Sequence, residues 1–572
     1  MSIKADRVFN NAKVYSVSMD GKETRAQAVA VKDGKIVFVG TDEQAGKWIG
    51  PDTEVCDCHG GSLLPGFGDA HMHFSISVRR FGVVDLNSIV SDYSKTTPDE
   101  VIEIIRKRVK DFAEIHPDAA VIHGSGWDRA WFTGALQGIA RPFTRHDIDA
   151  VVPDKPVVLD SFCGHVCLLN SKALELAGVT KDYPDPQGLI RKDKDGNPDG
   201  YIQEPVMIAP ICEAIPGFQF SDEEFKNGML DAQKLFISRG YTLVADCMKT
   251  DAAYKALMEL AESDRLRMRV RGVFNCNNAT AKKDLEYAVA NRNKFNCDDV
   301  MGIDTVKYFV DGNLAMCEPY SPEYCKKAGI PEDYRDPLLW KEEDLMKSME
   351  DFQKAGFNIH VHAMGDYGLK YTVDCMENAQ RKYNKDGKLR NIIAHCSYVK
   401  DEDKKRMGDN HIIASIQPEW ESENGESGSE LARMLGVERH RRTYPNKSLV
   451  DAGVVCAYGS DFTVGLPDAL AGIQTALTRR ICQTNVLYEA YKNTKPYMPE
   501  ECVTLKEAIK AHTINTAYQF HLENITGSIE TGKSAELVIL DKDIEAVPAN
   551  EICLIKVVET VFKGETVFKA EP

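Results

Sequence analysis

Short apolar runs with strand character recur along the middle of the chain, separated by segments with helical periodicity. Eight such runs occur, at 62–67, 242–246, 268–274, 305–310, 358–363, 391–396, 412–417 and 454–459. Between them, helices are predicted over stretches such as 222–239 and 342–355. Eight strands that alternate with helices indicate an α/β fold, the (β/α)8 TIM barrel, whose active site lies at the carboxyl ends of the strands.

Both ends of the chain carry shorter alternating runs that differ from the middle. These predicted strands cover 7–15, 26–31, 35–39, 535–540, 554–562 and 565–568. Asp33-Gly34 is a strong hairpin signal in the first group, and Lys563-Gly564 makes a turn in the second. We therefore predict one small β domain assembled from 1–61 and 521–572, with the barrel over 62–520.

The gap between the first two apolar runs is far longer than one βα unit needs. It predicts an inserted subdomain after the first barrel strand, over 76–220, rich in Gly, Trp and Pro. Because the insertion leaves from the carboxyl end of a barrel strand, we expect it to act as a lid over the active site. Trp127, Trp131 and Phe132 would suit such a lid, but they equally suit a small core of the insertion itself.

Composition narrows the class of protein. With 43% hydrophobic and 27% charged residues, the 572-residue chain is typical of a soluble globular protein. Its net charge of −17 argues against partners such as nucleic acid or an anionic membrane. The first residues lack a secretory signal, and no apolar run approaches the ~18 residues of a membrane helix. The 16 cysteines are scattered singly, which favours reduced thiols in the cytoplasm.

Histidines mark the ends of two predicted strands. His71 and His73 follow the first strand directly, and His360 and His362 form a second His-x-His in the fifth. In an extended segment, side chains two positions apart share a face, so both imidazoles of a pair can reach one ion. A single His-x-His is also compatible with two polar residues that simply leave a strand.

Further polar residues at strand ends favour a metal site. His395 closes the sixth strand, Asp461 closes the eighth, and Lys307 lies within the fourth among apolar neighbours. Zinc prefers imidazole and carboxylate ligands, and a catalytic site keeps one position open for water. A carboxylate such as Asp461 can both touch the metal and accept a proton when metal-bound hydroxide attacks a substrate. Iron, manganese and nickel are alternatives to zinc.

The sequence from 64 to 73, which reads LPGFGDAHMH, resembles the metal-dependent amidohydrolase superfamily. More narrowly, the chain is similar to amidohydrolase family 3, the group that includes N-substituted formamide deformylase-like and YtcJ-like proteins. The motifs that carry the resemblance lie at 126–128, 164–174, 196–204, 307–312, 360–366, 459–461 and 527–537. They extend over nearly the whole chain, so the resemblance implies the barrel together with a β-sandwich built from both termini.

The resemblance also implies roles for individual residues. His71 and His73 would hold the more buried metal ion. His362 and His395 would hold a second ion, and Asp461 would be the ligand that shuttles protons. Lys307 matches a lysine that is carbamylated in several relatives and bridges two metals. An unmodified lysine beside a single metal ion is the alternative.

Two histidines remain less specific. The resemblance implies that His165, in the insertion, faces the active site, although a histidine after a glycine is often structural. For His360 we expect a substrate contact or a structural hydrogen bond. Either histidine is a candidate to stabilise a developing oxyanion during catalysis.

We therefore predict a metal-dependent hydrolase of carbon–nitrogen bonds, acting on a linear amide of the N-acyl or N-formyl type. A cyclic amidase or an aminohydrolase of the same superfamily is the first alternative. A non-catalytic member that serves in binding or assembly is the second. Because relatives are frequently dimers, the resemblance implies a homodimer.

Overall fold

The computed structural model describes most of the chain as two compact units. The described residues are 4–76, 83–87, 89, 95–134, 136–161, 166–185, 188–247, 251–312, 314–328, 330–422, 430–485 and 488–571. The first unit comprises Met1–Ser75, Gln233–Asn485 and Tyr491–Pro572. The second comprises Ile76–Ala232 and Val486–Ala490.

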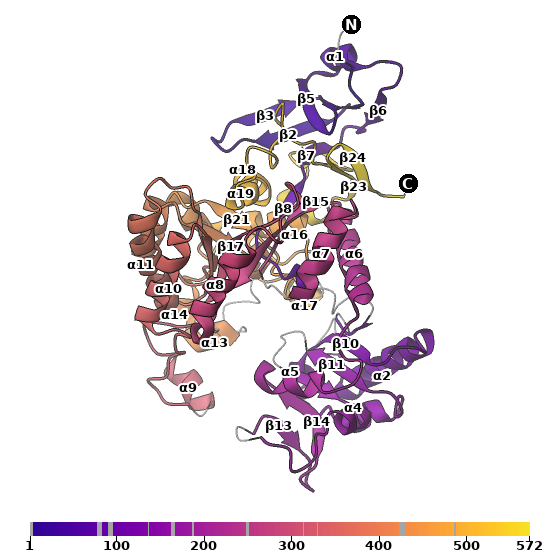
Figure 1. Cartoon of the computed structure of the whole chain (residues 1–572), viewed down its shortest axis with the longest axis vertical. Coiled ribbons are helices and arrows are strands. Elements are labelled where there is room, and N and C mark those ends of the chain that lie inside the picture. The colour runs from indigo at the N-terminus through magenta and orange to yellow at the C-terminus, as the bar shows by residue number, and fades with distance from the viewer. Residues whose placement is uncertain are drawn as a thin grey trace. The chain divides into compact units, whose positions relative to one another are not determined.

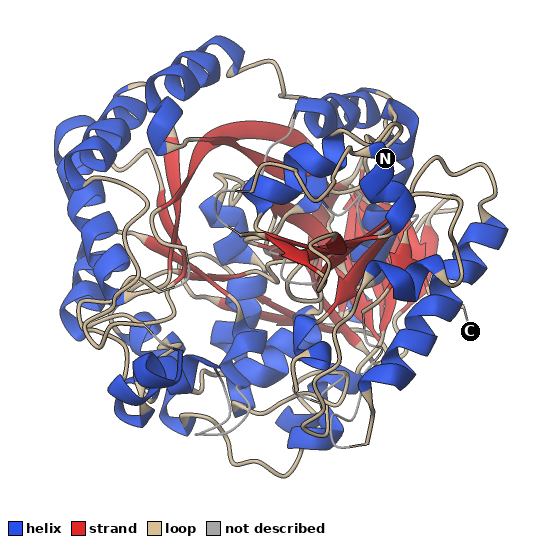
Figure 2. Cartoon of the chain, turned by 90° about the horizontal axis from the view of Figure 1, so that it is seen from below, coloured by secondary structure: helices blue, strands red, loops and turns tan. Residues whose placement is uncertain are grey.

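An eight-stranded parallel barrel forms the centre of the first unit. Its strands are β8 (Phe67–Asp69), β15 (Tyr241–Asp246), β16 (Arg269–Asn275), β17 (Met301–Phe309), β18 (Asn358–Ala363), β19 (Asn391–His395), β20 (Ile413–Ile416) and β21 (Cys456–Tyr458). The first and last strands approach each other where the Ala70 amide donates to the Tyr458 carbonyl at 2.8 Å. The predicted TIM barrel is therefore confirmed, and Figure 2 shows its strands as a curved red band with helices outside.

Helices connect the barrel strands in the predicted alternation. They include α6 (Asp222–Ser238), α7 (Asp251–Glu262), α8 (Ala281–Asn291), α10 (Glu342–Lys354), α11 (Asp366–Tyr383), α12 (Asp401–Asp409), α15 (Asn446–Asp451) and α16 (Ala469–Thr478). Two further helices, α18 (Leu505–His512) and α19 (Ile514–Gln519), follow and contact β21 and β8. The helices predicted over 222–239 and 342–355 thus end within one residue of α6 and α10.

The prediction of one barrel strand over 62–67 was wrong. This run divides into β7 (Ser62–Pro65), which pairs with strands of the β domain, and β8, which pairs with β15 in the barrel. Both pieces are buried at every residue, so no polar alternation marks the change of sheet. Gly66 joins the two strands. A residue without a side chain suits this position, because a Cβ atom would lie 2.3 Å from Thr242 Oγ1.

The β domain consists of two sheets that draw strands from both ends of the chain. One has the order β5-β4-β1-β6 and the other β24-β23-β22-β7-β2-β3. Their bounds are β1 (Arg7–Asn10), β2 (Lys13–Val17), β3 (Glu23–Ala26), β4 (Ala28–Lys32), β5 (Lys35–Gly40), β6 (Glu54–Asp57), β22 (Leu537–Leu540), β23 (Val557–Phe562) and β24 (Glu565–Lys569). Figure 1 shows indigo N-terminal strands beside yellow C-terminal ones.

A shared core holds the two sheets together. Phe9 and Val31 of the smaller sheet pack in one buried cluster with Leu63, Leu537 and Val561 of the larger. Because β7 pairs directly with β22, placing Leu63 opposite Ile539, neither terminus completes the sheet alone. The predicted β-sandwich from both termini is therefore confirmed.

Both turns predicted in this domain are two-residue hairpin loops. Asp33 and Gly34 join β4 to β5 with φ of 49° and 72°. Lys563 and Gly564 join β23 to β24 with φ of 49° and 83°. Positive φ at both central residues is the geometry that matches the twist of paired strands.

The second unit contains its own sheet, of order β13-β14-β12-β11-β10-β9. Its strands are β9 (Val84–Asp85), β10 (Ile122–Trp127), β11 (Val157–Ser161), β12 (Val166–Leu169), β13 (Ile190–Lys192) and β14 (Pro198–Gln203). Its helices are α2 (Pro98–Ile115), α3 (Arg145–Asp149), α4 (Ser171–Leu176) and α5 (Pro205–Glu213). Trp127, Trp131 and Phe132 are buried in the core of this unit. Of the two predicted roles, they therefore have that of a core and not that of a lid.

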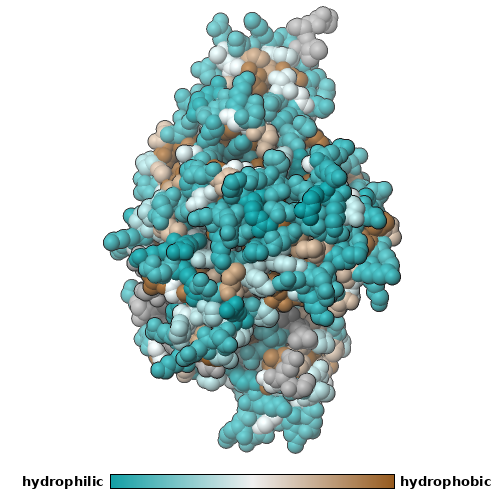
Figure 3. All heavy atoms as spheres, turned by 90° about the vertical axis from the view of Figure 1, so that its left-hand side faces the viewer, coloured by the Kyte–Doolittle hydropathy of each residue, from teal (hydrophilic) through white to brown (hydrophobic). Residues whose placement is uncertain are grey.

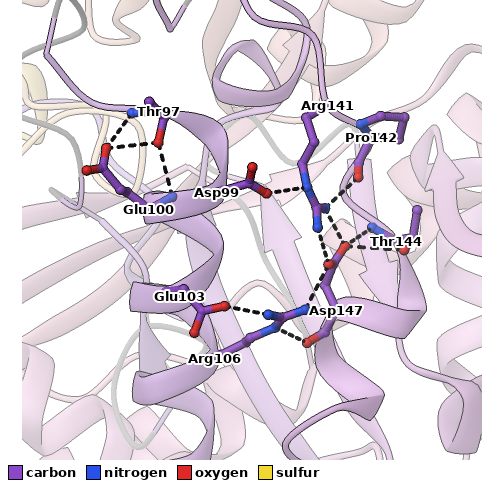
Figure 4. A network of polar contacts seen from close by, with 9 residues as sticks. All are labelled: Thr97, Asp99, Glu100, Glu103, Arg106, Arg141, Pro142, Thr144 and Asp147. Carbon is purple, nitrogen blue, oxygen red and sulfur yellow. Dashed lines mark hydrogen bonds and ion pairs between the residues drawn. The ribbon is translucent and has the colours of Figure 1, made fainter.

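A network of charges joins α2 to α3 in the second unit (Figure 4). The buried Asp147 carboxylate accepts hydrogen bonds from Arg141 at 2.7 Å and from Arg106 at 3.1 Å. The amide of Thr144 donates to the same group at 2.9 Å. Burial alone would raise the pKa of Asp147, but the hydrogen bonds from Arg141 and Thr144 lower it below its ordinary value.

One face of the molecule is mainly polar. Hydrophilic side chains cover most of the face in Figure 3, and hydrophobic ones are scattered among them. The large apolar residues that are exposed include Ile115 of α2 and Val289 of α8. Over the described residues, each helix is too short or too polar to cross a membrane.

A buried ion pair links the barrel to the β domain and yields a test of stability. Arg269, at the start of β16, binds Glu536 at 2.6 Å, and both side chains are fully buried. Removing one partner of such a pair typically costs about 3–5 kcal/mol because the other charge stays buried. We expect Glu536→Ala to lower the midpoint of urea denaturation accordingly.

The exposed pair Arg267–Glu565 is the matched control, with the same 2.6 Å separation. Exposed pairs contribute about 0–1 kcal/mol, so Glu565→Ala should leave the midpoint nearly unchanged. Equal shifts in the two variants would contradict the importance of the buried pair.

Candidate metal centre

Three predicted ligands meet where the first and last barrel strands end. His73 Nε2 lies 3.1 Å from Asp461 Oδ1, and His71 Nε2 lies 3.6 Å from the same oxygen. One donor atom from each of these three residues lies within 4.8 Å of the others. Asp461 reaches this position from a left-handed backbone, with φ of 52°. Such strained residues occur where the surrounding structure fixes them, often at active sites.

Lys307 of β17 borders the same group. Its Nζ lies 3.3 Å from His71 Nε2, and only 1% of the residue is exposed. Burial lowers the pKa of Lys307, because a charged ammonium is poorly solvated there. The structure therefore places the predicted lysine beside the predicted ligands.

His362 and His395 lie next to this group as a second pair. Their ring centroids are 4.5 Å apart, and the ring of His395 is 4.8 Å from that of His71. His362 Nε2 also faces Asp311 Oδ1 at 3.5 Å. Within the described residues, the tight groups of donor atoms include neither His362 nor His395. All the predicted ligands therefore share one region, although the second pair stands slightly apart.

His360 lies behind His71. Its Nε2 is 2.8 Å from His71 Nδ1, and the residue is fully buried. One of the two nitrogens must carry the shared proton. When His71 Nδ1 carries it, the lone pair of His71 Nε2 is left free on the side of Asp461. His360 thus contacts the ring of a predicted ligand, and its role as a structural hydrogen-bond partner stays a prediction. His165 lies outside the described residues, and its place at the site stays a prediction.

The protonation states suit a cation. Burial lowers the pKa of His71 and His360 well below the ordinary value, and that of His395 to about 4. Neutral imidazole is the form that binds metal ions. Asp461 Oδ1 and His362 Nε2 are buried and make no hydrogen bond within the described residues. A carboxylate oxygen that faces the neutral imidazole of His71 fits a divalent metal ion.

Asp69 is a buried residue whose role the sequence did not reveal. Its carboxylate accepts hydrogen bonds from the Ser460 hydroxyl at 2.5 Å, the Ser460 amide at 3.1 Å and the His71 amide at 3.2 Å. Burial raises the pKa of Asp69 to about 7. Asp69 thereby ties together the two segments that supply His71 and Asp461.

Two further residues position His395. Gln417, directly after β20, has its Oε1 2.8 Å from His395 Nδ1, which leaves the other ring nitrogen free. Trp420 stacks on the His395 ring, with 5.4 Å between centroids and 8° between planes. No local motif marks either residue, because both contacts arise from the placement of β20 beside β19.

Cys247 is the other residue that the prediction missed. It follows β15, is fully buried, and offers a donor atom within 4.8 Å of donors on His71 and His360. Burial raises the pKa of its thiol to about 12. Cys247 follows the second barrel strand, a place equivalent to that of the predicted His and Asp ligands on other strands.

The role of Gln417 can be tested through metal affinity. We expect Gln417→Leu to weaken zinc binding roughly 10–100-fold, the usual cost of losing an outer partner of a metal-binding histidine. Competition with a chromophoric chelator measures this. Gln233→Leu, which removes a buried glutamine that bonds to the backbone of Arg265 and Arg267, should bind zinc normally. Unchanged affinity in the Gln417 variant would contradict the orienting role.

Comparison with known proteins places this chain in a family. The chain is 24% identical to YtcJ of Bacillus subtilis (strain 168), over 98% of this chain and 99% of that protein. It is 26% identical to an N-substituted formamide deformylase of Arthrobacter pascens, over 99% and 98%. Over 12% of its length, the chain is also 39% identical to an adenine deaminase of Ruegeria sp. (strain TM1040).

The fold is also similar to that of a solved structure. An uncharacterized metal-dependent hydrolase from Pyrococcus horikoshii OT3 superposes with a TM-score of 0.71 at 23% identity, covering 95% of this chain and 99% of that one. The sequence model described as "Amidohydrolase family" matches residues 54–568. Because this match spans nearly the whole chain, as the motifs at the strand ends predict, the protein is a member of the amidohydrolase family.

Proposed function

We propose that this hydrolase cleaves carbon–nitrogen bonds, and that its substrate is a linear amide of the N-acyl or N-formyl type. The observation that carries the proposal is the convergence of His71, His73 and Asp461 beside the buried Lys307. The full-length likeness to a formamide deformylase supports a linear amide.

The metal would be held by residues from five barrel strands, His71, His73, Lys307, His362, His395 and Asp461. Imidazole with carboxylate suits Zn²⁺ best, as one or two ions. Bound there, a divalent ion polarises the substrate carbonyl and lowers the pKa of a water molecule. In a two-ion centre Lys307 would be carbamylated, as the resemblance implies, and its lowered pKa favours the neutral amine that reacts with CO₂.

Asp461 is the residue we assign to proton transfer. Burial alone would raise the pKa of Asp461, but His73, His395 and Lys307 hold it below its ordinary value. The carboxylate is thus ionised at neutral pH and accepts a proton from the attacking water. It then passes that proton to the leaving nitrogen, so that an amide and water give a carboxylic acid and an amine.

Replacing Asp461 separates proton transfer from metal binding. We expect Asp461→Asn to lower kcat roughly 10²–10⁴-fold, the range typical of general acid–base groups. Metal content should stay nearly intact, because the amide oxygen keeps the shape of a ligand. Steady-state kinetics and elemental analysis give the two values.

The exposed Asp451 of α15 provides the control, since it pairs with Lys447 on the same helix. Asp451→Asn should keep full activity and full metal content. Wild-type rates in Asp461→Asn would contradict the assigned proton transfer.

A substrate panel tests the reaction class. N-formyl and N-acyl amines, N-acyl amino acids and cyclic amides would be assayed with added zinc, with and without bicarbonate. We expect release of an amine and an acid from linear substrates, loss of activity with a chelator, and recovery with zinc. A higher rate with bicarbonate would support carbamylated Lys307.

Other outcomes favour the alternatives. Release of ammonia from a ring would favour an aminohydrolase. The short match to an adenine deaminase supports this alternative. A protein that binds metal but turns over no substrate would favour a binding role. The homodimer and the cytoplasmic location stay predictions.

A further inference from the structure

Two cysteines meet where a barrel helix contacts a segment of the β domain. Cys482 follows α16, and Cys553 lies in the 3-10 turn η7 (Ala549–Leu554), between β22 and β23. Both belong to the first unit, and their side chains pack with Ala471 in one small buried cluster. The two thiols share a hydrogen bond. The fold thus brings into contact two cysteines that lie far apart in the sequence.

Two glutamines hold the pair in place. The Cys553 amide donates to Gln474 Oε1 at 2.9 Å, and Cys553 Sγ lies 3.1 Å from Gln483 Oε1. Gln474 Nε2 in turn donates to Gln483 Oε1 at 2.8 Å. On the other side of the pair, Cys482 Sγ lies 3.2 Å from Thr475 Oγ1. Because these partners belong to α16 or to the segment directly after it, Cys553 is fixed against the barrel beside Cys482.

The surroundings make the two thiols chemically different. The hydrogen bond from Cys482 and those from the amides of Gln483 and Thr484 lower the pKa of Cys553 to about 6, against the effect of burial. The same contact between the thiols, together with burial, raises the pKa of Cys482. A thiolate is the form that attacks a disulfide. Cys553 is therefore the nucleophile of the pair, and Cys482 is placed to react with it in a second step.

The pair lies close to the surface. Cys482 and Thr484 line a cavity of about 110 Å³ together with Leu466, which is itself exposed. Leu554, the residue directly after Cys553, is also exposed. The two cysteines are only 3% and 6% exposed. A small reagent therefore reaches them more readily than another protein does.

We propose that Cys482 and Cys553 are a redox-active pair, which a small disulfide reagent oxidises to a disulfide that ties η7 of the β domain to the barrel. Cys553 attacks one sulfur of the reagent R–S–S–R, forms a mixed disulfide and releases the first R–SH. Cys482 then loses its proton and attacks the sulfur of Cys553, which releases the second R–SH. The protein loses two electrons and two protons, and the reagent gains them. This inference does not depend on the proposed hydrolase activity.

Oxidation of the full-length protein tests the pair. Reduced protein would be incubated with oxidised glutathione, its remaining thiols blocked, and its cross-linked peptides identified by mass spectrometry. We expect a disulfide between Cys482 and Cys553 in the wild type, and its reversal by dithiothreitol. The melting temperature should rise by several degrees on oxidation, because the disulfide closes a loop of about 70 residues.

Two variants distinguish the roles of the thiols. Cys482→Ser should accumulate a glutathione adduct on Cys553, because the thiol that would displace glutathione is missing. Cys553→Ser should form neither the adduct nor the cross-link, because the nucleophile is missing. If a serine variant fails to fold, as circular dichroism would show, the corresponding alanine variant replaces it, since the cluster already contains Ala471.

A second pair of cysteines provides the matched control. Cys167 of β12 and Cys212 of α5 share a hydrogen bond in a buried cluster of the second unit. Burial raises the pKa of Cys167 well above its ordinary value, so this pair should stay reduced. Cys167→Ser should form the cross-link between Cys482 and Cys553 as the wild type does.

Three outcomes would overturn the proposal. The first is a wild type in which Cys482 and Cys553 both stay reduced. The second is a wild type that carries glutathione on both cysteines without a cross-link. The third is a Cys482→Ser variant that gains no adduct on Cys553.

Discussion

The contact between Asp69 and Ser460 is the constraint on which the candidate metal centre depends. A barrel of eight strands must bring its first and last strands together, although Asp69 and Ser460 lie 391 positions apart along the chain. Asp69 makes this junction at the same level as the ligands, and its carboxylate also binds the amide of His71. The contact that closes the barrel therefore also brings His71 next to Asp461. Loss of the junction would separate the ligands before it unfolded the helices outside.

Around that junction, neutral partners decide which way each imidazole points. His360 faces one nitrogen of His71, and Gln417 faces one nitrogen of His395. The opposite nitrogen of His71 faces Asp461, and that of His395 is left free by the contact with Gln417. The protein thus prepares ring orientation before any ion arrives, and the order imposed on these side chains is part of the cost of folding.

The barrel and most of the site could be predicted because the polar residues of the site follow apolar runs that are recognisable as strands. His71, His73, His395 and Asp461 stand beside recognisable apolar runs, so their convergence follows from barrel geometry alone. The contacts of Gln417 and Cys247 could not be predicted in this way. They depend on the register between neighbouring strands, which a single sequence does not contain. The split of 62–67 between two sheets was hidden for a different reason, since strands buried on both faces lack alternation.

The pairing of β7 with β22 has a consequence for how the chain is made. β7 leaves the ribosome early, with one edge paired to β2, while its other partner is among the last residues synthesised. During the whole of barrel synthesis that edge exposes amide and carbonyl groups that other strands can capture. The nascent protein therefore needs protection at its N-terminal edge, and a truncated chain should aggregate through it. Completion of the molecule, and not of the barrel alone, ends this exposure.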